Sequence, residues 1–151
     1  MKKIVVISCL SFISTIIFAQ SSPREENKFG INATLFGPTL FVSASLDYFI
    51  TPSVCAEVGG GAIGYYGGLK YHFGGNSEKN WTPYLGGYFT YTVVPGFATK
   101  DLKANAIYIP VGFQYMANNG FTFSIEAAGF VSDKFKKDIT PWIGIKIGKH
   151  F

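Results

Sequence analysis

Apolar and polar residues alternate with a period of two along most of the chain after residue 27, and no stretch there keeps the 3.6-residue period of an amphipathic helix. The alternating segments are about ten residues long, which is the length of a transmembrane β-strand. The segment that ends at Phe151 is the clearest. One of its faces carries Ile143, Ile145, Ile147 and Phe151, with Lys149 among them, and the other carries Trp142, Gly144, Lys146, Gly148 and His150.

The same alternation predicts seven earlier strands, which makes eight in total. Residues with turn chemistry separate several of them, as at Gly37-Pro38, Thr51-Pro52-Ser53 and Asn118-Asn119-Gly120. Two prolines fall inside predicted strands, and we interpret Pro83 and Pro110 as bulge or edge-of-membrane positions because proline removes a ladder donor. The earlier segments are 29–36, 40–50, 54–62, 65–73, 81–93, 106–116 and 121–131.

The two faces of these strands differ in bulk. One face carries large aliphatic and aromatic residues, and the other carries glycine, hydroxyl and charged residues. Eight strands enclose only a narrow space, which suits the small and polar face. The bulky face must then lie outside, against lipid. The sequence therefore predicts an all-β fold, an eight-stranded antiparallel transmembrane up-and-down β-barrel. A soluble lipocalin-like barrel or a sandwich is the alternative, and it would reverse the two faces.

Charged residues recur on the predicted inward face. Charges in a water-poor lumen are costly unless they are paired and hydrogen-bonded. We therefore expect an internal network that plugs the barrel, while a proton or ion path is the functional alternative. The predicted luminal charge network consists of Asp47, Glu57, Lys70, His72, Glu126 and Lys146.

The N-terminus is typical of a secretory signal peptide. Lys2 and Lys3 precede an apolar run over residues 4–18, and Ala19 supplies a small residue at the cleavage point. We expect a signal-peptide helix over residues 1–19, a disordered polar lead-in over 20–27 and the barrel over 28–151. Removal of residues 1–19 lowers Lys+Arg from 13 to 11 against nine acidic residues, so the net charge falls from +4 to +2. This near-neutral balance does not support a nucleic-acid partner.

None of the short motifs in the sequence supports a catalytic or ligand-binding site. The glycine pattern at 59–64 matches a dinucleotide-binding motif, but the segment after it reads as a strand, where that motif requires a helix. Cys55 is the one cysteine after residue 19, so neither an internal disulfide nor a metal site is predicted. Nothing in the spacing brings a nucleophile to His72 or His150. The sequence thus predicts no catalytic, cofactor or metal site and a protein that is not an enzyme.

Aromatic residues mark one end of the predicted barrel. They lie near strand ends beside short turns, where an interfacial girdle belongs. An even number of strands puts both termini on one side, which we take as periplasmic, and the longest outer loops are then 94–105 and 132–139. The girdle residues are Tyr48, Tyr71, Phe73, Trp81, Tyr115, Phe121 and Phe151.

With these features the chain resembles the small outer-membrane β-barrel proteins of Gram-negative bacteria, of the OmpA-membrane-domain and OmpX type. The resemblance covers residues 28–151 and includes the end Lys146-Ile147-Gly148-Lys149-His150-Phe151. It implies an outer-membrane location after cleavage of the signal peptide, contact with outer-membrane lipid, a monomer, and a C-terminal signal for the barrel-assembly machinery. That signal would consist of Ile143, Ile145, Ile147, Gly148 and Phe151, and Lys149 departs from its apolar pattern.

The resemblance does not select one activity, because its members include structural anchors, adhesion and stress proteins, narrow pores and a few lipid-modifying enzymes. We expect a structural or surface-interaction role. A narrow pore or conduit for small solutes is the alternative. A lipid A-modifying enzyme is disfavoured by the missing histidine-centred site.

Overall fold

A computed structural model describes residues 22–94, 102–132 and 139–151 of the chain. The expected signal peptide (1–19) lies outside the described residues, as does most of the two expected long outer loops. Among the described residues, no helix is both long enough and apolar enough to cross a membrane.

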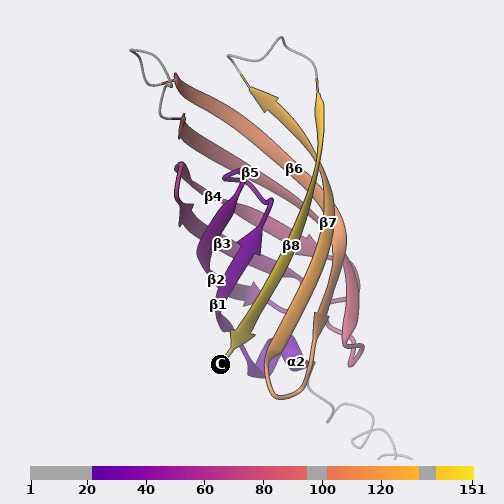
Figure 1. The fold of residues 1–151 in the computed structure, drawn as a ribbon. Coiled ribbons are helices and arrows are strands. Elements are labelled where there is room, and N and C mark those ends of the chain that lie inside the picture. The colour runs from indigo at the N-terminus through magenta and orange to yellow at the C-terminus, as the bar shows by residue number, and fades with distance from the viewer. Residues whose placement is uncertain (1–21, 95–101, 133–138) are drawn as a thin grey trace, which may run out of the picture.

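Eight antiparallel strands form a closed barrel in which each strand pairs with the next and β1 pairs with β8 (Figure 1). This arrangement confirms the predicted eight-stranded antiparallel barrel. The strands are β1 (Phe29–Leu35), β2 (Val42–Thr51), β3 (Val54–Gly61), β4 (Gly64–His72), β5 (Trp81–Val94), β6 (Leu102–Met116), β7 (Phe121–Ser132) and β8 (Thr140–His150).

The register of the eight pairs sets the tilt of the strands. A path of directly paired residues that leaves Gly30 in β1 and crosses every strand in turn arrives at Thr140 in β8. Gly30 itself pairs with His150. The circuit therefore slips by ten residues along β8, and a stagger of this kind is what tilts the strands of a closed barrel by about 35–45°. Because paired residues face the same side of the sheet, this path stays on the inner face.

The wall is taller on one side. The strands β5–β8 have 11 to 15 residues, whereas β1–β4 have 7 to 10. At the end away from the C-terminus, the ribbons of β6 and β7 extend beyond the β1–β2 turn (Figure 1). The start of β6 at Leu102 lies four residues before the predicted 106, because residues 102–105 still pair with β5.

The first turn corrects one prediction. Leu40 was expected in a strand, but it lies in the turn 36–41, and both Phe36 and Leu40 adopt positive φ angles (56° and 71°). Phe36 N–H donates to Phe41 O, and Leu40 N–H donates to Gly37 O, so the turn is closed by its own backbone. The side chain of Leu40 then packs against buried residues of the lumen. Alternation alone could not reveal a turn that folds inward.

The two strand prolines do not lie at bulges. The β5–β6 register is the same on both sides of Pro110, but no pairs form at Gly86 and Gly87, opposite Pro110 and its neighbour. Met116 N–H donates to Asn80 O, and alternation along an antiparallel ladder then directs the nitrogen of Pro110 at Gly86. The missing donor therefore interrupts the ladder without a shift of register. Pro83 lies near the start of β5, where the β4 ladder ends.

The lead-in 20–27 was expected to be disordered, but residues 22–27 are ordered. They include a single helical turn, α2 (Pro23–Glu26), which begins with proline at a position where the missing N–H costs nothing. Ser22, Pro23 and Arg24 are buried. The guanidinium of Arg24 donates to the carbonyl oxygens of Lys79 (3.2 Å) and Asn80 (3.3 Å), so α2 is attached to the β4–β5 turn.

Candidate functional site

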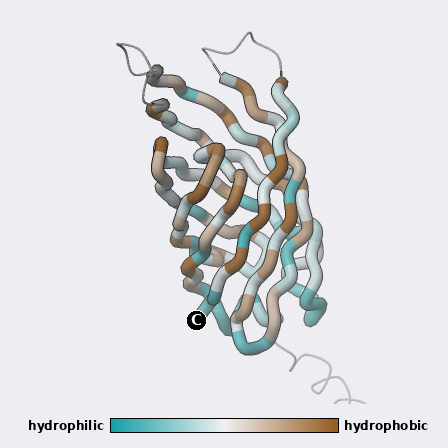
Figure 2. Tube along the Cα trace, in the orientation of Figure 1, coloured by the Kyte–Doolittle hydropathy of each residue, from teal (hydrophilic) through white to brown (hydrophobic). Residues whose placement is uncertain are grey.

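The barrel is inverted relative to a soluble protein. Buried and exposed residues alternate along its strands, and hydropathy alternates with them along β1, β2 and β8 (Figure 2). The exposed residues are mostly the bulky apolar ones, with Lys149 on β8 as a charged exception. Five charged residues of the strands point inward and are at most 4% exposed: Asp47, Glu57, Lys70, Glu126 and Lys146. This confirms the predicted faces. Outward apolar residues occur on every strand, for example Ile31, Leu46, Val58, Leu69, Phe89, Val111, Ile125 and Ile145.

Glu57 on β3 is the centre of the luminal network. Its carboxylate lies 2.9 Å from Lys70 Nζ of β4, and it forms a second ion pair with Lys146 of β8. It also accepts hydrogen bonds from the hydroxyls of Tyr66 (2.8 Å) and Tyr88 (2.9 Å). Four donors from three other strands therefore compensate one buried carboxylate, as a charge in a lumen requires.

Asp47 on β2 extends this network toward the C-terminal end of the barrel. Its carboxylate lies 3.3 Å from Lys70 Nζ and 3.0 Å from Nε2 of His150. It also accepts a hydrogen bond of 2.9 Å from the side-chain amide of Asn32. Lys70 thus bridges two carboxylates, and the last strand is connected to the second over Gly30 of β1, which pairs with both Asp47 and His150.

Glu126 lies in the lumen but does not pair with a lysine. Tyr84 and Tyr108 donate hydrogen bonds to its two carboxylate oxygens, the latter at 2.8 Å. Among the described residues, neither the three lysine–carboxylate ion pairs nor the His150–Asp47 contact includes Glu126. Lys146 pairs with Glu57 and not with Glu126.

His72 was expected in the charge network, and its place is a correction. The side chain is buried in the lumen, yet it takes part in none of the ion pairs among the described residues. Its ring packs against Phe49 (ring centroids 5.3 Å apart) and Tyr84 (5.4 Å). An aromatic layer at the C-terminal end of the lumen holds His72, whereas His150, which also packs against Phe49, lies 3.0 Å from Asp47.

The sequence analysis missed the tyrosines. Their inward positions follow from alternation, but their role as carboxylate partners depends on the register between strands. Glu57 and Tyr88 are 31 residues apart, and Glu126 and Tyr84 are 42 apart. The inner residues that sequence reasoning left out of the network are Asn32, Tyr66, Tyr84, Tyr88, Tyr108 and His150.

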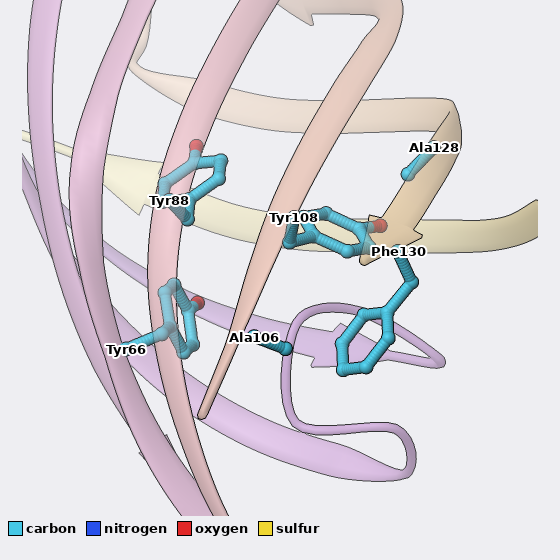
Figure 3. Close-up of a cluster of buried hydrophobic side chains, with 6 residues drawn as sticks. All are labelled: Tyr66, Tyr88, Ala106, Tyr108, Ala128 and Phe130. Atoms are coloured by element: carbon cyan, nitrogen blue, oxygen red, sulfur yellow. The ribbon is translucent and has the colours of Figure 1, made fainter. Parts of the chain in front are cut away.

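Apolar layers enclose the polar network at both ends. Toward the end away from the C-terminus, a buried cluster in the lumen includes Tyr66, Tyr88, Tyr108 and Phe130 (Figure 3), and Leu40 and Trp142 pack against it. Toward the termini, Phe49, Cys55 and Met116 form a second cluster. The polar network between them is therefore shielded from water along the barrel axis, which strengthens each ion pair.

Glycine makes room for the buried carboxylates at two positions. A Cβ atom on Gly30 would overlap Asp47 and His150, and a Cβ atom on Gly144 would lie 2.7 Å from Glu126 Oε1. Both glycines therefore permit a close approach that no other residue would allow.

Arg24 offers a test of the attachment of α2. Burial lowers the pKa of its guanidinium to about 10, so it remains a cation at neutral pH. Arg24→Ala leaves two carbonyl oxygens without their charged donor, and we expect it to lower the free energy of unfolding by about 1.5–3 kcal/mol. The measurement is urea unfolding in lipid vesicles, with Glu25→Ala, an exposed position of the same turn, as the control. Equal midpoints for the two variants would show that the hydrogen bonds of Arg24 contribute nothing to stability.

Comparisons of the chain with protein-family models, with curated proteins and with solved structures give no match.

Proposed function

We propose that the protein is an integral outer-membrane β-barrel of a Gram-negative bacterium, without enzymatic activity, with a structural or surface-interaction role and a lumen plugged by side chains. The observation that carries this proposal is the inverted distribution of polarity around a closed barrel. Charges are buried within, and large apolar side chains are exposed around the whole circumference.

Hydrocarbon is the solvent that suits this surface. Soluble monomers rarely expose contiguous apolar patches larger than a few hundred Å². Along the ladders that join each strand to the next, a closed barrel also satisfies its backbone hydrogen bonds, which is the condition for a β-structure to cross a bilayer. The aromatic girdle agrees with this orientation, because Tyr48, Tyr71, Trp81 and Phe151 are all exposed at the C-terminal end.

The luminal contacts favour a plug over a pore. Passage of a solute would have to separate Lys70 and Lys146 from Glu57, and it would have to displace the apolar layers above and below. Leaving one charge of a buried ion pair without its partner costs about 3–5 kcal/mol. A network of this kind holds opposite walls of the barrel together, which suits a rigid anchor.

Folding and conductance test the proposal together. Urea-denatured protein should fold into phosphatidylcholine vesicles, migrate faster on a gel before heating than after it, and produce no discrete current steps in a planar bilayer. Folding in buffer without lipid would contradict the membrane assignment. Reproducible current steps would replace the plug with the narrow pore.

The proposed assembly signal at the C-terminus can be separated from the structural role of the same residue. Phe151 exchanges two backbone hydrogen bonds with Phe29, and its side chain is exposed. We expect Phe151→Ala to reduce the amount of folded protein in the outer membrane of cells, while Phe151→Trp retains it. Both variants should fold into vesicles in vitro as the natural chain does, because the backbone bonds remain. Wild-type levels of Phe151→Ala in cells would refute a signal at this residue.

A further inference from the structure

The barrel wall has a step where the short first strand meets the long last one. The β1–β8 ladder ends at the pair Leu35–Ile145, but β8 continues for five more residues to Thr140, which pair with β7. Within the described residues, neither β1 nor the turn 36–41 forms a backbone hydrogen bond with this extension. The part of β8 over residues 140–144 therefore has an open strand edge on the side that faces β1.

Alternation shows which backbone groups face this open edge. Phe29 and Phe151 exchange two hydrogen bonds, so every second residue along β8 directs its N–H and C=O toward β1. In the extension these residues are Ile143 and Pro141. Because proline has no N–H, one donor that would otherwise be unpaired is absent from the sequence itself.

An apolar groove occupies the step. It has a volume of about 410 Å³ and lies between the turn 36–41 and the upper parts of β7 and β8. The recess arises because β7 carries Ala127 and Gly129 on its outward face, between the larger residues Ile125 and Val131. The lining residues are Phe36, Ala127, Ala128, Pro141, Trp142 and Ile143. Ala128 and Trp142 come from the inward face of the sheet, so at the step the groove reaches the edge of the luminal cluster.

The groove lies at the level of the outer leaflet. Ile143 is eight residues from Phe151 of the girdle, which corresponds to ~20 Å along the barrel axis at the usual rise and tilt of a strand, against an apolar band of ~25 Å. The neighbouring side chains are apolar and exposed as well: Ile143 is 65% exposed, Phe41 59% and Ile139 71%. Hydrocarbon therefore extends to the groove.

From these observations we propose that the groove at the β1–β8 step binds one acyl chain of an outer-leaflet lipid; this rests on the proposed membrane location. The volume is within the range of about 300–1,000 Å³ that is typical of small-molecule sites. A strand from a second protein suits the edge less well, because only Ile143 offers both a donor and an acceptor there and Pro141 blocks further pairing.

Fluorescence quenching can detect such a chain, because Trp142 lines the groove and the only other tryptophan, Trp81, lies in the girdle. Trp81→Phe leaves Trp142 as the reporter, and Trp142→Phe leaves Trp81. Each variant is folded in detergent micelles and titrated with a phospholipid brominated on its acyl chains. A parallel titration uses a brominated free fatty acid. Ala127→Phe fills the groove. Ala33→Phe, the same substitution in a separate apolar groove of the wall beside β1, is the matched control.

We expect saturable quenching of Trp142 by the phospholipid at a mole fraction about tenfold below that needed for Trp81. In the Trp81→Phe background, Ala127→Phe should abolish the saturable quenching of Trp142, and Ala33→Phe should retain it. Equal, unsaturated quenching of both tryptophans would overturn the proposal, as would saturation by the fatty acid alone. Gel mobility before heating is measured for every variant, so a failure of the membrane fold would be recognised separately from a failure of the groove to bind lipid.

Discussion

Ile145→Arg is expected to lower the free energy of unfolding in lipid vesicles by about 2–4 kcal/mol, the cost of arginine facing lipid near the bilayer midplane. Ile145 points outward from β8, and the residues paired with it on either side, Leu35 and Ile125, also point outward and are apolar. An arginine there would have no polar partner on the wall. Urea titration of folding into phosphatidylcholine vesicles measures the change.

The neighbouring position provides the contrast. Lys146 points into the lumen beside Glu57, and Lys146→Ala should still insert because Lys70 remains 2.9 Å from the same carboxylate. Ile145→Leu controls for a change of shape without a charge. If Ile145→Arg folded as well as the natural chain, the outward face of β8 would not be a lipid-facing surface.

Glu57→Gln should destabilise the barrel by about 3–5 kcal/mol, because it removes a buried charge on which two lysines depend. The amide keeps the size of the side chain, but it has a single accepting oxygen, so only one of Tyr66 and Tyr88 can still donate to it in the present geometry. Lys146 then has no carboxylate partner among the described ion pairs, and Lys70 keeps only Asp47. Equilibrium unfolding in vesicles reports the loss.

Glu126→Gln is the matched control for this variant. Its carboxylate is bound by two tyrosine hydroxyls and forms no ion pair among those described, so its replacement should cost clearly less than that of Glu57. A double-mutant cycle of Glu57→Gln with Lys146→Met should give a coupling energy of about 0.5–3 kcal/mol. Additive effects in this cycle, or equal losses for the two glutamates, would contradict a network centred on Glu57.

The strands were predictable because period-two alternation is a local signal. Each outward residue of β8, from Ile143 to Lys149, could be assigned from its neighbours alone, and the turn at 117–120 is marked by Asn118, Asn119 and Gly120. Inward charges followed from the same alternation. These features require no knowledge of how one strand is placed against another.

The partners of the charges were not predictable, because they depend on the register summed around the barrel. Lys146 and Glu57 are 89 residues apart and meet across the lumen only at one stagger of the strands. Glu126 likewise takes its partners from β5 and β6. A polar segment such as 20–27 also gives no alternating signal, so the docking of Arg24 beneath the barrel could not be read from composition.

The most direct test of the lipid-facing assignment is the environment of adjacent side chains on β8. With Cys9 and Cys55 replaced by serine, a single cysteine at position 145 or 146 is spin-labelled, and the protein is folded into phosphatidylcholine vesicles. Collision with oxygen, which concentrates in hydrocarbon, is then compared with collision with a water-soluble nickel chelate. We expect the label at Ile145 to collide readily with oxygen and little with nickel, and the label at Lys146 to be shielded from both. Ready collision of the Ile145 label with nickel would contradict the proposal that this face contacts the membrane.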